Sequence, residues 1–160
     1  MIKPITESDL NDCLNLLKTS YEAGAIRFGQ TEENCPYRGR TRLPLSEFRQ
    51  EFLDGHQMYG YYHDDTRVGF LSLSFNDGIV RVCDLAILPE YQKRGFGSEL
   101  MSFIRDEAKR QNCEIIRLGM IDDNIELKAW YEKHGYKTIK LTKFDTVTYT
   151  VGLMELVLQK

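Results

Sequence analysis

One short segment of the chain combines glycines with basic residues in a way that suits phosphate binding. It reads Gln92-Lys93-Arg94-Gly95-Phe96-Gly97-Ser98. A strand-like apolar run precedes it and a helical pattern follows, so we expect it at the start of a helix. The first turn of a helix leaves backbone N–H groups unpaired and carries a partial positive charge, and a pyrophosphate satisfies both. Gly95 and Gly97 let the backbone approach the phosphates, and Lys93 and Arg94 add side-chain charge. A glycine-rich turn without a ligand explains the same residues.

The hydrophobic pattern predicts a mixed α/β chain around this segment. Apolar residues at helical spacing predict helices near residues 10–21, 45–52, 97–111 and 125–133. Apolar and aromatic runs between turn residues predict strands at residues 58–62, 68–75, 79–88, 115–121, 136–141 and 146–158. The strand–helix–strand unit implies that strands 79–88 and 115–121 are parallel, and Gly152 suggests a bulge in the last strand. We expect one domain over residues 1–160.

Two motifs resemble the signatures of the GNAT acetyltransferases. Residues 85–98, LAILPEYQKRGFGS, are similar to a strand ending in L-x-V-x-P before Q/R-x-x-G-x-G/A. Residues 124–136, NIELKAWYEKHGY, are similar to N-x-x-A-x-x-x-Y-E-K-x-G-F. The resemblance covers residues 57–140 closely. Lys93 and Leu127 depart from it, because family members often have glycine and a small residue there.

The resemblance implies the GNAT acyl-CoA N-acyltransferase fold. That fold is a mixed, mostly antiparallel sheet of about six to seven strands with a central splayed parallel pair, flanked by about four helices. Acetyl-CoA would be the cosubstrate, with its pyrophosphate on residues 92–98 and its pantetheine arm between the splayed strands. Leu85 and Ile87 would pair with the pantetheine amides, and a backbone N–H near Ala86 or Ile87 would polarise the thioester carbonyl. Asn124 matches the asparagine that contacts the coenzyme, and a helix N-cap is its other interpretation.

The resemblance also implies an N-acetyltransferase that moves an acetyl group to a primary amine by direct attack in a ternary complex. Tyr131 matches the family tyrosine that protonates the leaving thiolate, a role that suits a phenol with a pKa near ~10. The alternative for Tyr131 is a core residue on an amphipathic helix.

The amine must lose a proton before it attacks, and Asp84 is our candidate for the general base. It lies on the strand that bears the thioester site. A strand-end salt bridge for Asp84 and a base acting through water are the alternatives. Asp122 and Asp123 follow the partner strand, where turn and capping roles also explain them.

Composition argues against several other classes of protein. The net charge is −3 and the arginines form only a loose cluster near residues 38–49, so we expect no nucleic-acid partner. No run approaches about 18 apolar residues, so we expect no membrane span. The N-terminus lacks the pattern of a signal peptide, which favours the cytoplasm. The cysteines, at positions 13, 35, 83 and 113, form no C-x-x-C pair and the histidines lack ligand spacing, so we expect reduced cysteines and no metal.

The acceptor and the assembly stay open at this level. Residues 22–43 lack a regular pattern and take the place of the family's variable substrate loop. Their Tyr37, Arg38, Arg40 and Arg42 could hold an acidic acceptor or form a solvated surface. The last strand could extend a sheet across a homodimer or pair only within the chain. The alternative function is a non-catalytic acyl-CoA-binding regulatory module; a tRNA-acetylating toxin is disfavoured by the acidic balance.

Overall fold

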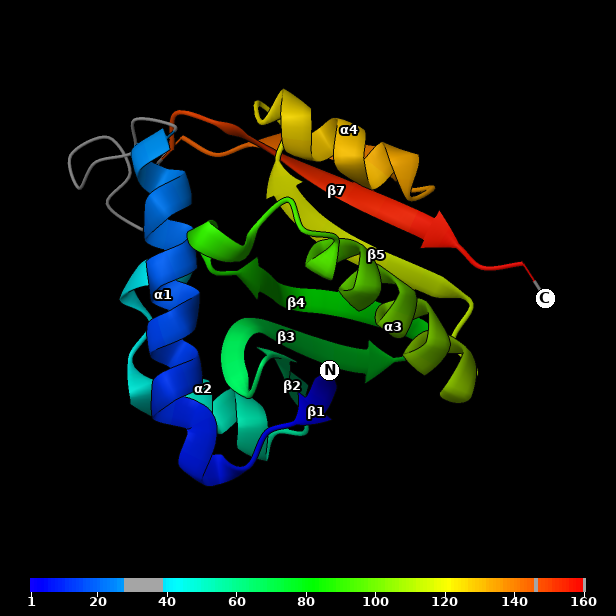
Figure 1. Ribbon diagram of the computed structural model, residues 1–160. Coiled ribbons are helices and arrows are strands. Elements are labelled where there is room, and N and C mark those ends of the chain that lie inside the picture. Colours follow the sequence, from blue (N-terminus) through cyan, green and yellow to red (C-terminus); the bar gives the residue numbers. More distant parts are fainter. Residues whose placement is uncertain (28–38, 146, 160) are drawn as a thin grey trace.

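The computed structural model describes residues 1–27, 39–145 and 147–159 (Figure 1). The helices are α1 (Leu10–Arg27), α2 (Leu45–Leu53), α3 (Phe96–Arg110) and α4 (Ile125–Lys133), with short 3-10 helices η1 (Glu7–Asp9), η2 (Gly39–Arg42) and η3 (Pro89–Tyr91). The strands are β1 (Ile2–Pro4), β2 (Gln57–His63), β3 (Thr66–Asn76), β4 (Ile79–Ile87), β5 (Ile115–Ile121), β6 (Lys137–Lys143) and β7 (Thr150–Val157). Across these ranges, none of the helices offers an apolar stretch of the length that a bilayer crossing needs.

Within the described ranges the strands form one seven-stranded sheet in the order β1-β2-β3-β4-β5-β7-β6. All neighbouring strands are antiparallel except β4 and β5, which are parallel. The predicted mixed sheet with a central parallel pair is therefore confirmed, and so are the predicted helices. The first helix continues to Arg27, beyond the end expected from its apolar pattern.

The strands differ from the sequence prediction in two places. The first strand, β1, was not predicted, because its three residues are too few for an alternating pattern. The bulge expected at Gly152 does not occur there, since Gly152 pairs in register with Met120 and Leu141. The glycine instead permits a close approach, because a Cβ at this position would lie 3.4 Å from Oδ1 of Asp122.

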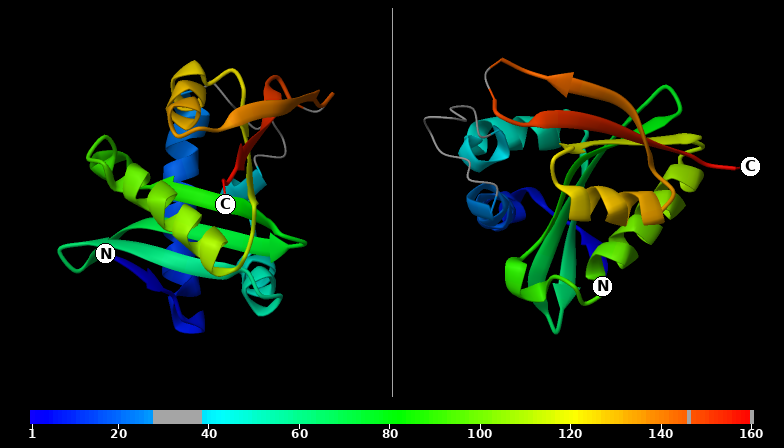
Figure 2. Two further views of the ribbon diagram at one scale, coloured as in Figure 1. Left: turned by 90° about the vertical axis from the view of Figure 1, so that its right-hand side faces the viewer. Right: turned by 90° about the horizontal axis from the view of Figure 1, so that it is seen from above.

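Helices cover both faces of the sheet, as the two views of Figure 2 show. On one face, α3 packs its Leu100 and Ile104 against Val80 of β4 and Ile116 of β5. On the other face, the buried side chains of α1 and α2 pack against Phe70 and neighbouring residues. The sheet therefore separates two cores, and a side chain of β4 enters one or the other according to the face it occupies.

A bulge in β4 changes which face its side chains occupy. Ser72 of β3 pairs with Asp84, but the next residue, Leu73, pairs with Val82, so Cys83 is an extra residue in β4. Val82 belongs to the core under α3, whereas Ala86 belongs to the core under α1 and α2. Even-numbered residues of a regular strand share a face, so the extra residue moves Asp84 and Ala86 to the α1 side.

The parallel strands β4 and β5 separate just beyond this bulge. They pair over four residues each, from Ile79 with Ile115 to Val82 with Leu118. Beyond that point β4 continues for five residues and β5 for three without pairing to each other. The last residues of β5 remain paired with β7 on its other side. The two strands thus form a fork, and the inner edge of residues 83–87 of β4 has no strand partner among the described residues.

Candidate active site

The predicted phosphate segment, residues 92–98, turns sharply between the end of β4 and α3. Lys93 and Gly95 both have left-handed backbone conformations, with φ of 60° and 86°, and Gly95 is the N-cap of α3. A Cβ at Gly95 would meet no heavy atom within 4 Å, so the space above the helix N-terminus is open. Figure 1 shows α3 starting near the carboxyl ends of β4 and β5. The N–H groups of the first turn therefore fit a pyrophosphate beside the fork.

The polar side chains of this segment have different surroundings. Gln92 donates a hydrogen bond from Nε2 to the carbonyl of Ile87, at 3.0 Å, which ties the turn to the end of β4. Lys93 is largely exposed and its Nζ lies 3.6 Å from a carboxylate oxygen of Glu126. The guanidinium of Arg94 lies over the ring of Tyr91, 5.0 Å from its centroid. Gln92 therefore has a structural role, while two cations stand at the surface beside the helix N-terminus.

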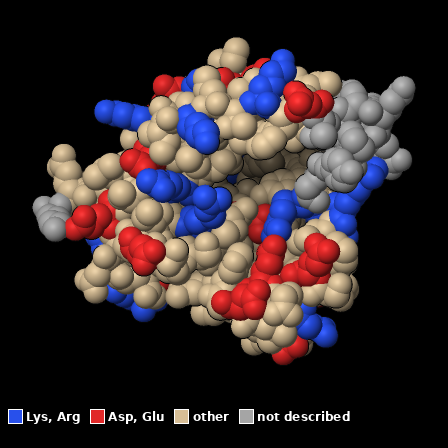
Figure 3. Space-filling model, turned by 180° about the vertical axis from the view of Figure 1, so that it is seen from behind, with Lys and Arg blue, Asp and Glu red and all other residues tan. Residues whose placement is uncertain are grey.

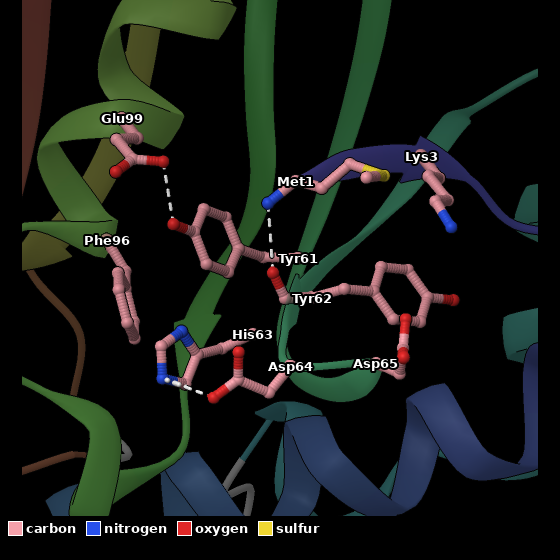
Figure 4. A pocket seen from close by; sticks show the side chains of 9 residues that line it. All are labelled: Met1, Lys3, Tyr61, Tyr62, His63, Asp64, Asp65, Phe96 and Glu99. Carbon is pink, nitrogen blue, oxygen red and sulfur yellow. Dashed lines mark hydrogen bonds and ion pairs between the residues drawn. The ribbon is translucent and has the colours of Figure 1, made fainter.

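Phe96 points away from the fork, into a hollow of about 550 Å³ at the β1–β2 edge of the molecule. Figure 4 shows its ring beside Tyr61 and His63, whose centroids lie 4.9 Å and 5.0 Å away. The Tyr61 hydroxyl donates to Glu99 of α3 at 2.6 Å. Phe96 therefore anchors α3, and only its backbone N–H is suited to a phosphate.

The packing of α3 against α4 also explains why residue 97 is a glycine. A Cβ at Gly97 would lie 3.1 Å from Cζ2 of Trp130, so the glycine lets α3 and α4 come close together. The indole ring packs edge-on against Tyr131 and His134, at centroid distances of 5.1 Å and 4.6 Å. Ser98 Oγ lies 3.4 Å from Nε2 of His134. The phosphate segment and α4 are thus joined in one packed unit.

Tyr131 and Asn124 lie at opposite ends of α4. Tyr131 is 7% exposed, and burial, together with neighbouring Tyr136, raises its pKa well above the usual value. Its phenol is therefore protonated at neutral pH, as a general acid must be. The Asn124 side chain accepts a hydrogen bond from the N–H of Leu127 at 3.1 Å, so the N-cap interpretation is confirmed, while its contact with the coenzyme stays a prediction.

Asp84 lies on the α1 side of β4 and is 1% exposed. Arg40 of η2 donates to both of its carboxylate oxygens, from Nε at 2.8 Å and from Nη2 at 2.5 Å. The same guanidinium donates to Glu51 of α2 at 2.6 Å and 2.8 Å. Burial raises the pKa of Asp84, and the charge and hydrogen bonds of Arg40 oppose that shift. The salt-bridge alternative for Asp84 is thus observed, and the solvated-surface alternative for Arg40 is not.

Tyr21 of α1 joins this group, although its sequence context marked it only as part of an apolar stripe. Its hydroxyl lies 3.3 Å from Oδ1 of Asp84. Burial and Asp84 raise the pKa of Tyr21, while the backbone N–H of Leu85 lowers it and Tyr131 raises it further. Tyr21 therefore joins Arg40 as a hydrogen-bond donor to the buried carboxylate of β4.

The other candidate residues divide into those near the fork and those with structural contacts. Leu85, Ala86 and Ile87 lie on the stretch of β4 that has left β5. Asp122 accepts from Nζ of Lys128 at 2.7 Å, and Asp123 accepts from the N–H of Thr150 at 2.8 Å. These two acids therefore stabilise the turn before α4. Of the loop residues proposed for the acceptor, Tyr37 and Arg38 lie outside the described residues, as does Cys35.

A hollow of about 370 Å³ opens at the fork on the face opposite α3. Figure 3 shows this side of the molecule hollowed, with basic and acidic side chains around the depression. Val82 and Leu118, the last paired residues of β4 and β5, lie in its wall. The residues that line it are Arg40, Glu51, His56, Arg81, Val82, Cys83, Arg117, Leu118, Gly119 and Leu153. The fork therefore has the N-terminus of α3 on one side and a charged hollow on the other.

Comparison with known sequences gives one family. The model of the acetyltransferase (GNAT) family matches residues 19–136 of the chain. Uncharacterized protein YxbD of Bacillus subtilis (strain 168) is 30% identical over 90 residues, which cover 56% of this chain and 54% of that protein. The chain thus matches about half the length of this relative.

Solved structures share the arrangement over almost the whole chain. The ribosomal-protein-S18-alanine N-acetyltransferase from Escherichia coli has a TM-score of 0.78 at 14% identity, covering 100% of this chain and 94% of its own. The PaiA N-acetyltransferase from Thermoplasma acidophilum, solved in complex with coenzyme A, has a TM-score of 0.76 at 20% identity and covers 98% of both chains. At these identities the likeness establishes the fold.

The buried Asp84–Arg40 pair predicts a pH-dependent loss of stability in an Arg40→Gln variant. Removing one partner of a buried ion pair costs about 3–5 kcal/mol of unfolding free energy, because the remaining charge is uncompensated. Burial already raises the folded-state pKa of Asp84 above its unfolded value, and without Arg40 that pKa rises further, so the loss is greatest at neutral pH and shrinks as acid protonates Asp84. Urea unfolding at neutral and mildly acidic pH measures both effects.

Arg49→Gln is the matched control, because Arg49 is half-exposed on α2 and lies 3.6 Å from Glu7. We expect it to change stability by no more than about 0.5 kcal/mol. Equal losses in the two variants, or a loss that grows in acid, would contradict the assignment.

Proposed function

The chain belongs to the GNAT acetyltransferase family, and from this premise we propose that it transfers an acetyl group from acetyl-CoA to a primary amine by direct attack in a ternary complex. The family supports acyl transfer from an acyl-CoA in general. The observation that carries the finer proposal is the fork between β4 and β5, with the N-terminus of α3 on one side and a charged hollow on the other. Donor and acceptor can therefore approach the same stretch of β4 from opposite faces.

We propose that the donor lies along the unpaired edge of β4. Backbone groups of Leu85 and Ile87 would pair with the pantetheine amides, and the N–H of Ala86 or Ile87 would polarise the thioester carbonyl. The pyrophosphate would lie on the first turn of α3. There Gly95 leaves open space, and Lys93 and Arg94, both exposed, contribute charge. A Cβ at Gly119 would also meet nothing within 4 Å, which supports open space over the face of β5 beside the fork.

Tyr131 is the proposed general acid. When the amine nitrogen forms its bond to the acetyl carbon, the carbon–sulfur bond breaks and the leaving sulfur takes the Tyr131 hydroxyl proton. Burial keeps that proton on the phenol until the carbon–sulfur bond breaks. The transfer to sulfur is concerted with cleavage of that bond, so no free thiolate has to form in the apolar surroundings of Tyr131.

Asp84 is the proposed acceptor of the proton from the amine. Arg40 favours its ionised form but also occupies both carboxylate oxygens, so a proton reaches Asp84 only when one hydrogen bond opens. The bond from Tyr21, at 3.3 Å, is the longest of the three. Deprotonation through this phenol, or through water, is consistent with the same geometry.

Because Arg40 occupies both oxygens of Asp84, this carboxylate is not free to act as a base. This observation favours the alternative function, a non-catalytic acyl-CoA-binding regulatory module. Such a module binds acetyl-CoA but transfers no acetyl group to any amine. The buried phenol of Tyr131 supports the enzyme, because a binding module needs no thiolate acid. A screen of amines with acetyl-CoA, followed by free thiol release, distinguishes the two.

A Tyr131→Phe variant should bind acetyl-CoA with unchanged Kd and turn over more slowly. We expect kcat to fall roughly 100-fold or more, because the leaving thiolate loses its proton donor. Tyr136→Phe is the control, since Tyr136 is buried beside Tyr131 and its hydroxyl has no hydrogen-bond partner among the described residues. Thiol release at saturating amine measures both variants, and a similar kcat for the two would remove Tyr131 from the acid role.

An Asp84→Asn variant should show a pH-dependent loss of kcat/KM. At neutral pH the amine is protonated and needs a base, so we expect a loss of roughly 100-fold or more. At alkaline pH the amine loses its proton to solvent, and the difference from the parent enzyme should narrow. Glu51→Gln, which perturbs the same guanidinium, serves as the control and should give a pH-independent change. A uniform loss for Asp84→Asn at every pH argues that the carboxylate is only structural.

A further inference from the structure

Two arginines that line the hollow at the fork, Arg81 and Arg117, belong to a row of charged side chains that continues on neighbouring strands beyond the hollow. Arg81 of β4 pairs in register with Arg117 of β5, and Arg117 pairs with Glu155 of β7. Residues paired across strands share a face of the sheet, so these three side chains form one row. On the far side of Glu155, Lys137 of β6 continues it. The row therefore holds three cations and one anion.

The anion of this row compensates only one of the two arginines in the hollow. Nε of Arg117 donates to Glu155 at 2.7 Å. Arg81 is exposed, and in residues 1–27, 39–145 and 147–159 its side chain makes no ion pair or hydrogen bond. Two like charges on adjacent strands repel each other, and Glu155 compensates Arg117 alone, so a second anion beside Arg81 would relieve the repulsion. Both guanidinium groups line the hollow.

The other wall of the hollow has the opposite balance of charge. There the guanidinium of Arg40 donates to Glu51, which lines the hollow, and to Asp84, which is buried behind Arg40 and outside the lining, so one cation is shared by two carboxylates. His56 lines the same wall, with Nδ1 4.0 Å from an oxygen of Glu51. With Asp84 ionised, this end of the hollow carries net negative charge, whereas the Arg81 end carries net positive charge. The hollow is therefore bipolar along β4.

We propose that this hollow is the acceptor subsite and that it selects an amine that also carries an anionic group, a carboxylate or a phosphate. The inference rests on the proposed acetyl transfer, because it places the acceptor nitrogen beside the thioester at the fork. The ammonium end lies toward Glu51 and Asp84, and the anion binds the guanidinium groups of Arg81 and Arg117, whose planar forks match carboxylate and phosphate oxygens.

The spacing along the strand indicates a compact acceptor. Arg81 and Asp84 are three residues apart, which corresponds to roughly 10 Å of extended strand, shortened by the bulge at Cys83. Their side chains reach into this interval, so only a short carbon chain fits between the amine and the anion. In the transfer itself the nitrogen–acetyl bond forms, the carbon–sulfur bond breaks, the amine proton passes to the base and the thiolate receives the proton of Tyr131.

The test compares amines that differ only in the group at the far end. Putrescine, aminobutanol and γ-aminobutyrate present a cation, a neutral hydroxyl and a carboxylate on the same carbon chain, and ethanolamine with phosphoethanolamine gives the phosphate arm. A hydrogen-bonded charge contact predicts kcat/KM about 10- to 100-fold higher for an anionic amine than for its neutral counterpart. The two arms show whether the subsite takes carboxylate or phosphate.

Charge reversal at Arg81 tests whether a preference for anionic amines comes from this subsite or from another part of the protein. Because Arg81 is exposed, we expect Arg81→Glu to fold normally, to lose the preference for anionic amines and to raise kcat/KM for putrescine. Arg110→Glu, at the exposed end of α3 and outside the hollow, is the control and should keep the parent profile.

The outcomes distinguish this inference from the function on which it rests. Equal kcat/KM across each matched set, or an anionic preference that survives Arg81→Glu, overturns the subsite and leaves acetyl transfer intact. If acetyl-CoA binds but neither these amines nor a wider panel of amines causes thiol release, both the transfer and the subsite are overturned.

Discussion

The single extra residue in β4, Cys83, determines how the rest of the site is built. In a regular strand Asp84 would share a face with Val82 and enter the apolar core under α3. A buried carboxylate there would lack a compensating charge and would cost several kcal/mol. The bulge turns Asp84 toward α1, where Tyr21 and Arg40 meet it. It also coincides with the point at which β4 leaves β5, so one irregularity both orients the acid and opens the fork.

The Arg40–Asp84–Glu51 cluster then holds three separate elements around that fork. Its guanidinium, supplied by η2, joins β4 to α2 through four hydrogen bonds at 2.5–2.8 Å. Such a buried cluster is weak evidence for stability, because desolvation offsets much of the attraction. Apolar side chains in place of this cluster would leave that wall of the hollow without charged groups. The cluster instead fixes a carboxylate beside the proposed thioester position and gives one wall of the hollow its negative balance.

The sequence was sufficient to locate the glycine turn before α3 and insufficient to predict the contacts around Asp84. Gly95 and Gly97 signal a turn and a close approach locally, so their place at the N-terminus of α3 followed from spacing and from the strand–helix order. Tyr21 and Glu51 come from distant helices, and no periodicity indicates which buried carboxylate or guanidinium a side chain will reach. Gly152 suggested a bulge, but the glycine is there because a side chain would crowd Asp122. The actual bulge, at Cys83, has no residue type that signals it.

The central claim is that the fork and the first turn of α3 hold acetyl-CoA, and a calorimetric titration tests it most directly. We predict saturable binding of one acetyl-CoA per chain, with pantetheine, which lacks the pyrophosphate, binding at least about 10-fold more weakly because it forgoes the charge-assisted contacts at the helix N-terminus. No detectable binding of acetyl-CoA, or equal affinity for acetyl-CoA and pantetheine, would contradict the account.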